Sequence, residues 1–81
     1  MRIQLEAFAV LRDFLQEEMF EYEVPEGTTA DQLIKQLAKS FPDAKHILDV
    51  TRLAHAEEYL HKDELIHQGE TYSLIPPVSG G

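Results

Sequence analysis

The sequence predicts an α+β fold, a roll in which a mixed sheet of four or five strands packs on one main helix. Segments in which apolar and polar residues alternate lie near both ends of the chain, and this period of two is typical of strands with one buried face. Between them, residues 30–41 carry one continuous apolar stripe at helical spacing. A single stripe of this kind is best buried against one face of a sheet.

The first two strands are predicted at residues 2–9 and 19–24. In both segments apolar or aromatic residues occupy every second position. Pro25 ends the second strand because it cannot donate a hydrogen bond to a neighbouring strand. Residues 10–15 break the alternation and suit a short helical turn. The short link between the two strands predicts that they pair in an antiparallel arrangement.

The main helix is predicted to begin after Thr29, whose hydroxyl can cap it. Gln32 follows three residues later and completes a capping-box pattern. Pro42 ends the helix, since the residue before a proline is displaced from helical geometry. The apolar stripe that should face the sheet consists of Ala30, Leu33, Ile34, Leu37, Ala38 and Phe41.

The second half of the chain predicts two more strands. Residues 43–52 are ambiguous and allow one helical turn, and residues 53–60 form a weakly patterned third strand. A turn at Gln68-Gly69 precedes the last strand at residues 71–75. In that strand Tyr72 and Leu74 share one face, and Thr71, Ser73 and Ile75 share the other.

Length and charge limit what the chain can do. Its 81 residues suffice for one domain with a modest core. A formal net charge of −8 disfavours nucleic acid and anionic membranes as partners and favours a basic protein. The sequence contains no secretory leader pattern. It also lacks an apolar run of the ~20 residues that span a bilayer, so we expect a cytoplasmic protein.

No residue pattern predicts a metal site or a catalytic centre. The absence of cysteine removes disulfides, a thiolate nucleophile and a common zinc ligand. The four histidines lack the spacing of metal-binding pairs, so we expect no metal. These histidines are His46, His55, His61 and His67.

An acidic run without any base precedes and covers the second strand. It consists of Glu17, Glu18, Glu21, Glu23 and Glu26. The run is either the solvated face of an outer strand or a docking patch for a basic partner.

The most distinctive segment is the C-terminal one. Two prolines favour an extended chain, and glycines without Cβ atoms can thread a narrow channel on another protein. We therefore predict a tail at residues 76–81 as the working part of the chain, carried by a domain at residues 1–75. The tail consists of Pro76, Pro77, Val78, Ser79, Gly80 and Gly81.

The reactive group that this tail predicts is the terminal carboxylate of Gly81. A carboxylate is inert at neutral pH, but ATP can convert it to an acyl adenylate in the active site of a partner. Sulfur attack on the adenylate would give a thiocarboxylate, and attack by an amine would give an amide. The absence of side chains lets the reacting groups approach closely, which is the positioning part of catalysis.

Four segments together resemble the small subunit of molybdopterin synthase, a ubiquitin-like sulfur carrier. The most specific is the ending at residues 75–81. The others are the first strand with residues 8–14, the helix start at Gly27-Thr28-Thr29, and the turn at residues 63–70. The family's third strand usually ends in a valine–asparagine pair, whereas this chain has His55-Ala56.

The resemblance implies a β-grasp fold and the role of a sulfur donor in molybdenum cofactor biosynthesis. An ATP-dependent enzyme of the ubiquitin-activating kind would adenylate Gly81, and a sulfurtransferase would supply the sulfur. The large subunit, within a heterotetramer, would accept the tail and pass the sulfur to a cyclic pyranopterin precursor. The active site would then lie on the large subunit, and the chain itself would bind no cofactor.

Three other functions fit the same tail. The chain could carry sulfur for thiazole or cysteine synthesis, or it could be a ubiquitin-like modifier joined to lysines through Gly81. It could also be a plain interaction module, whose function would survive the loss of Gly81. For the partner interface we expect an apolar patch on the exposed face of the sheet near the tail, with Phe8, Leu60 and Leu74 as candidates.

Overall fold

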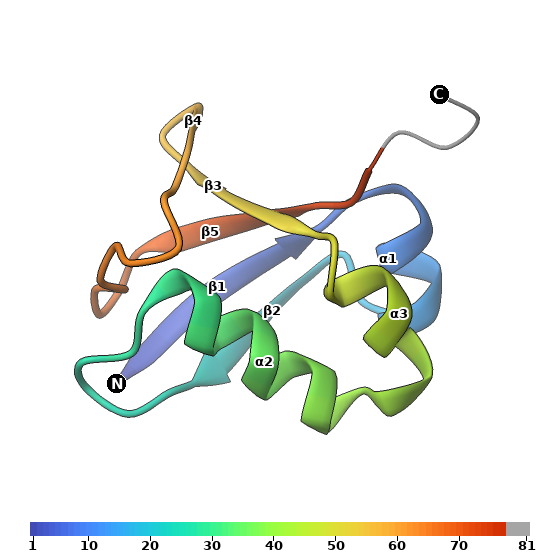
Figure 1. Cartoon of the computed structure of the whole chain (residues 1–81), viewed down its shortest axis with the longest axis horizontal. Coiled ribbons are helices and arrows are strands. Elements are labelled where there is room, and N and C mark those ends of the chain that lie inside the picture. The colour runs from blue at the N-terminus through green and yellow to red at the C-terminus, as the bar shows by residue number, and fades with distance from the viewer. Residues whose placement is uncertain (78–81) are drawn as a thin grey trace.

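The computed structural model describes residues 1–77, which form five strands and three α-helices. The sheet has the order β2-β1-β5-β3-β4, with β1 and β5 parallel and the other neighbours antiparallel. The predicted α+β roll with a mixed sheet is confirmed (Figure 1). In chain order the elements are β1 (Arg2–Ala7), α1 (Ala9–Leu15), β2 (Met19–Glu23), α2 (Ala30–Ser40), the 3-10 turn η1 (Pro42–Ala44), α3 (Lys45–Leu48), β3 (Arg52–His55), β4 (Glu58–Tyr59) and β5 (Thr71–Ile75).

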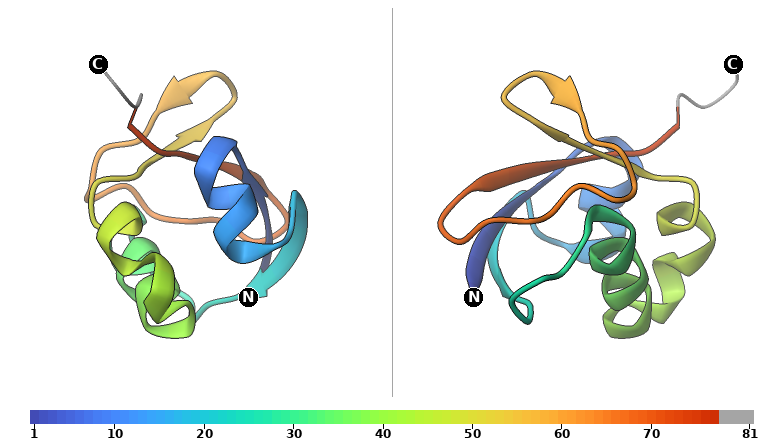
Figure 2. Two further views of the ribbon diagram at one scale, coloured as in Figure 1. Left: turned by 90° about the vertical axis from the view of Figure 1, so that its right-hand side faces the viewer. Right: turned by 60° about the vertical axis from the view of Figure 1, so that its left-hand side comes forward.

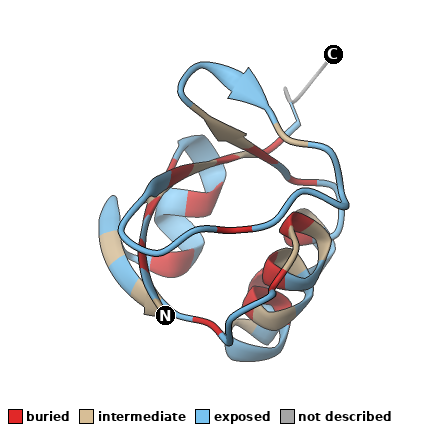
Figure 3. Cartoon of the chain, turned by 90° about the vertical axis from the view of Figure 1, so that its left-hand side faces the viewer, coloured by how far each residue is buried: buried red, intermediate tan, exposed pale blue. Residues whose placement is uncertain are grey.

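The helices cover one face of the sheet and one of its ends. Helices α2 and α3 lie on the same side of the sheet, and α1 lies at the end where β1 and β5 terminate (Figures 1 and 2). Buried residues, coloured red in Figure 3, occur on both the helices and the strands and make up the core. The face of the sheet turned away from α2 is called the outer face below. The largest fully buried residues are Tyr72, Ile3, Leu5, Leu11, Leu33, Leu37, Leu48 and Leu74.

Helix α2 is held at both ends by the residues that the sequence indicated. The Thr29 hydroxyl accepts a hydrogen bond from the Gln32 N–H at 3.3 Å, and Oε1 of Gln32 accepts from the Thr29 N–H at 3.0 Å. This capping box satisfies two donors that a helix start leaves free. At the other end Phe41 leaves helical geometry directly before Pro42. Leu33 and Leu37 are fully buried. The burial of each side chain stabilises the fold by about 2 kcal/mol.

Strands β1 and β2 pair as predicted, with Ile3 opposite Tyr22 and Leu5 opposite Phe20. β1 is shorter than predicted because α1 begins at Ala9. The predicted helical turn is confirmed as α1, which buries Leu11 and ends at Gln16 in a left-handed conformation, with φ 58°.

The prediction of one strand over residues 53–60 is wrong, because this segment is a hairpin. β3 turns back through Ala56 and Glu57 into β4, so that His55 lies opposite Glu58. The φ angles of Ala56 and Glu57 are 51° and 68°. A two-residue turn of the I′ type requires positive φ at both positions and usually has the sequence Asn-Gly. The sequence Ala-Glu gives no such signal.

Candidate functional site at the end of strand β5

The last described residues leave the sheet at its centre. Ile75 is paired with Arg52 of β3, and the preceding Leu74 is paired with Ala7 of β1. The chain therefore emerges between the end of β1 and the start of β3 (Figure 1). Pro76 is buried and Pro77 is exposed. The remaining predicted tail residues, Val78, Ser79, Gly80 and Gly81, lie outside the described residues.

Apolar side chains surround this exit on the outer face of the sheet. Phe8 follows the buried Ala7 in extended geometry and is 39% exposed, so it lies on the opposite side of the strand from Ala7. Ile75 is half-buried beside it, and Tyr59 of β4 is 51% exposed. We call Phe8, Tyr59, Ile75 and the intervening Arg52 the exit patch.

The exit patch contains one cation, held by an aromatic ring. The guanidinium carbon of Arg52 lies 3.9 Å from the centroid of the Tyr59 ring, which is cation–π geometry. Within residues 1–77 no carboxylate lies within 4.0 Å of Arg52. Arg2 and Arg12, in contrast, are each paired with glutamates.

Only one of the three predicted patch residues lies on the exposed sheet face. Phe8 lies there, but Leu74 has 0% exposure, so its predicted place in an exposed patch is wrong. Leu60 is partly buried against the core and lines a depression between α2 and β3, so it is not on the outer face either. Their chain neighbours Ile75 and Tyr59 occupy the outer face instead. The alternation in residues 71–75 already separated Ile75 from Leu74, whereas nothing in the sequence indicated Tyr59.

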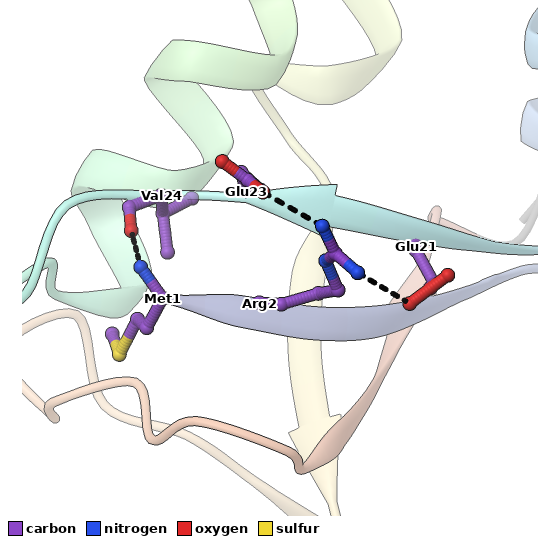
Figure 4. Close-up of polar contacts among 5 residues, drawn as sticks. All are labelled: Met1, Arg2, Glu21, Glu23 and Val24. Carbon is purple, nitrogen blue, oxygen red and sulfur yellow. Dashed lines mark hydrogen bonds and ion pairs between the residues drawn. The ribbon is translucent and has the colours of Figure 1, made fainter.

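The acidic run lies on and beside β2, an edge strand of the sheet. Arg2 reaches across from β1 and places its guanidinium 3.0 Å from Glu23 and 3.8 Å from Glu21 (Figure 4). The hydrogen bond that Arg2 donates to Glu23, together with the negative charges of Glu21 and Glu23, raises the pKa of Arg2. Glu18 pairs with Arg12 at 3.3 Å. Three of the five glutamates of the run are therefore paired with bases from other elements, which favours its interpretation as the solvated face of an edge strand.

The described residues contain no metal-binding cluster of three or more histidine, aspartate or glutamate side chains. The ring of His46 meets Phe14 edge-on, with centroids 5.7 Å apart. His55 packs on the ring of Tyr72 and lies 3.3 Å from a carboxylate oxygen of Glu70. Both histidines thus have structural contacts.

The start of α2 is closed to anions. The N–H groups of Ala30 and Asp31 donate to the carbonyls of Glu64 and Lys62 at 2.9 and 3.1 Å, and the capping box takes two more. A helix start binds phosphate through free N–H groups. These donors are already used, so this helix start is no phosphate site.

Tyr72 is the one phenol inside the core, and its surroundings keep it neutral. Its hydroxyl accepts a hydrogen bond from the His67 N–H at 2.9 Å. Burial raises the pKa of Tyr72, and the charges of Glu70 and Glu64 raise it further. The residue therefore has the properties of a structural core tyrosine and not of a general base. Among residues 1–77 the remaining candidate for a functional site is therefore the end of β5, where the chain leaves the sheet.

The helix-covered mixed sheet, with its last strand at the centre and the chain leaving beside an exposed apolar patch, defines a ubiquitin-like β-grasp domain. The predicted β-grasp fold is confirmed by solved structures. A protein described as a putative molybdopterin converting factor subunit 1 from Pyrococcus furiosus superposes with a TM-score of 0.84 over 96% of this chain and 99% of its own, at 24% identity. SAMP1 from Haloferax volcanii superposes with a TM-score of 0.81 over the whole of both chains, at 20% identity.

The chain belongs to the ThiS family, whose model matches residues 5–81. Two relatives are described as molybdopterin synthase sulfur carrier subunits. The one from Dictyostelium discoideum is 30% identical over 77 residues, covering 91% of this chain and 90% of its own. The one from Drosophila ananassae is 35% identical over 77 residues, covering 91% and 84%. Within residues 1–77 no helix is both long and apolar enough to cross a membrane.

Proposed function

We propose that this chain is the sulfur carrier subunit of a molybdopterin synthase. The observation that carries the proposal is the delivery of the Pro-Pro-Val-Ser-Gly-Gly ending from the central strand β5 at the rim of the exit patch. The relatives described as molybdopterin synthase sulfur carrier subunits support the choice of pathway. An exposed apolar patch at the base of a tail is typical of a protein-docking surface.

The proposed partner is the large subunit of the synthase. A similar fold occurs in a complex of subunits 1 and 2 of the molybdopterin-converting factor from Helicobacter pylori, with a TM-score of 0.67 and 22% identity. In our proposal the exit patch docks on the large subunit and the tail enters its active site. A fully extended segment of the length of residues 76–81 reaches at most about 20 Å, enough to enter a deep channel.

The proposed chemistry takes place at the carboxylate of Gly81. One carboxylate oxygen attacks the α-phosphorus of ATP on an activating enzyme, and pyrophosphate leaves. Hydrosulfide, or a persulfide whose sulfur–sulfur bond a thiol then reduces, displaces AMP from the acyl carbon and leaves a thiocarboxylate. On the large subunit the thiocarboxylate sulfur displaces an oxygen substituent from a carbon of the pyranopterin precursor, and water then cleaves the acyl–sulfur bond to restore the carboxylate. Each cycle consumes one ATP and one sulfur atom and returns Gly81 unchanged.

In this scheme the acids and bases of catalysis belong to the partners. The described residues of this chain support such a division. The core tyrosine is held neutral, the start of α2 is capped, and His46 and His55 are engaged in packing contacts. The domain's contribution is to present the tail and to hold it against the correct protein.

The test is sulfur transfer by a reconstituted system of this chain, its activating enzyme, a sulfur donor and the large subunit. A form extended by one residue beyond Gly81 should give no dithiolene product while unfolding at the same temperature as wild type. Lys39→Ala, on the exposed side of α2, is the matched control and should be fully active. Normal product formation by the extended form would contradict the proposal.

A further inference from the structure

Arg52 is unusual among the basic residues of this acidic chain. Of the seven lysines and arginines, Arg2, Arg12, Lys35 and Lys45 are paired with carboxylates. In residues 1–77, Arg52, Lys39 and Lys62 have no carboxylate within 4.0 Å. Of these three, only Arg52 lies on the sheet beside the exit of the chain, opposite Ile75.

The guanidinium of Arg52 is held in place by an aromatic ring. Its stacking on Tyr59, at 3.9 Å from the ring centroid, uses the flat face of the group. Its N–H donors lie in the plane of the guanidinium, around the edge, and none of them donates to an acceptor in residues 1–77. A side chain already fixed by a ring loses less entropy when it binds than a free arginine does.

The surroundings of Arg52 determine what must meet it. Ile75 and Tyr59 adjoin it, and Phe8 lies on the far side of Ile75. A protein that covers these apolar side chains also removes Arg52 from water. Burial of a charge without a partner costs several kcal/mol, so a protein that binds here tightly must supply an acceptor of opposite charge.

We propose that Arg52 is a recognition residue that binds an aspartate or glutamate, framed by apolar side chains, on the large subunit that receives the tail. The inference rests on the proposed function, since it assigns the chemistry of that partner surface. The chain carries a net charge of −8, and its overall field attracts basic surfaces. Arg52 makes the surface charge positive at this point. It therefore favours an acidic contact there and fixes how the two proteins align when they dock.

The experiment measures the dissociation constant of the large subunit from the same organism for four variants. Arg52→Glu should weaken binding by about 100-fold or more, because it places two carboxylates together in a desolvated contact. Arg52→Lys keeps the charge but loses the planar fork and should weaken binding by about tenfold. Tyr59→Leu keeps an apolar side chain but removes the ring that holds Arg52, and should weaken binding by about three- to tenfold.

The matched control is Lys39→Glu, which makes the same change of charge on the exposed side of α2. It should alter binding by no more than about threefold. All four substitutions are at exposed positions, so unfolding temperatures should stay close to that of wild type. Equal effects of Arg52→Glu and Lys39→Glu would overturn the inference, since only the total charge would then matter.

A second measurement identifies the acid. Each exposed aspartate and glutamate on the tail-binding side of the large subunit is changed to arginine, one at a time, and tested with Arg52→Glu. One such pair should recover at least tenfold of the lost affinity, and failure of every pair would overturn the inference. If the wild-type chain itself does not bind the large subunit, the proposed function fails and this inference fails with it, a result distinct from a wild-type complex that ignores Arg52.

Discussion

The two faces of the sheet at the exit of β5 differ completely, although they are built from adjacent residues. Leu53 and Leu74 lie opposite each other on the inner face and are 3% and 0% exposed. Arg52 and Ile75, one residue away in each strand, lie opposite each other on the outer face and remain accessible. The inner pair belongs to the core that keeps the domain folded, and the outer pair belongs to the exit patch. Adjacent residues of these strands therefore have different roles: one residue stabilises the core, and the next belongs to the exit patch.

The largest expected effect compares Leu74→Ala with Ile75→Ala. Loss of the Leu74 side chain leaves a cavity in the core and should lower the free energy of unfolding by about 2–5 kcal/mol. Ile75 is half-buried on the outer face, so its substitution should cost about 1 kcal/mol or less while weakening binding of the large subunit. Urea unfolding measures the first quantity. Equal losses of stability in the two variants would break the division between the faces.

Two tyrosines, Tyr72 on the inner face and Tyr59 on the outer face, sharpen the same comparison. Tyr72→Phe removes the acceptor for the His67 N–H and should lower the free energy of unfolding by about 1 kcal/mol. Tyr59 is 51% exposed, so Tyr59→Phe should leave stability unchanged and retain the ring beneath Arg52. Thermal unfolding of both variants is the measurement, and a larger loss for Tyr59→Phe would contradict the assignment of faces.

The comparison of wild type with Tyr72→Phe also predicts how the free energy of unfolding depends on pH. Because burial raises the pKa of Tyr72 above its usual value of 10.0, the unfolded chain releases this proton at a lower pH than the folded chain. The stability is fully present below about pH 10 and is lost as the pH rises from there through the raised pKa. The difference in unfolding free energy between wild type and Tyr72→Phe should therefore shrink above pH 10. A constant difference up to pH 11 would show that Tyr72 titrates alike in both states.

A smaller gain is expected at the turn between β3 and β4. Ala56 and Glu57 hold positive φ angles of 51° and 68°, which residues other than glycine and asparagine adopt at a cost. The double substitution Ala56→Asn and Glu57→Gly should raise the free energy of unfolding by about 1 kcal/mol. Affinity for the large subunit should not fall, because Tyr59 and Arg52 keep their places. A loss of stability would show that the turn is not of the I′ type.

The smallest effect is expected at Arg2 of β1, the other arginine of the sheet. Arg2 is fully paired with Glu21 and Glu23 on the solvated surface (Figure 4). Exposed pairs of this kind contribute little to stability. Arg2→Ala should leave both the unfolding temperature and the affinity for the large subunit unchanged. If Arg2→Ala weakened binding as much as Arg52→Ala, the exit patch would extend to the acidic edge.

The sequence predicted the fold well wherever periodicity and local chemistry agreed. The apolar stripe of α2, its capping box, and the alternation in β1 and β5 all stand in the sequence as explicit patterns. The residues of the exit patch were harder to predict. Alternation shows which residues of a strand share a face, but it does not show at which residue a short strand begins. The turn at Ala56 and Glu57 carries no turn residues, so the start of β4 could not be predicted. The sequence therefore indicated Leu60, one residue after Tyr59, as the exposed residue. Arg52 could not have been found, since its role depends on a ring across the hairpin.

The central claim is that the working group of this protein is the carboxylate of Gly81, and the intact mass of the chain tests it most directly. The purified protein is incubated with ATP, its activating enzyme and a sulfur donor, and its mass is compared before and after. We predict a gain equal to the replacement of one oxygen by sulfur, located on Gly81 by fragmentation. An unchanged mass, or isopeptide bonds from Gly81 to lysines of other proteins, would contradict the account.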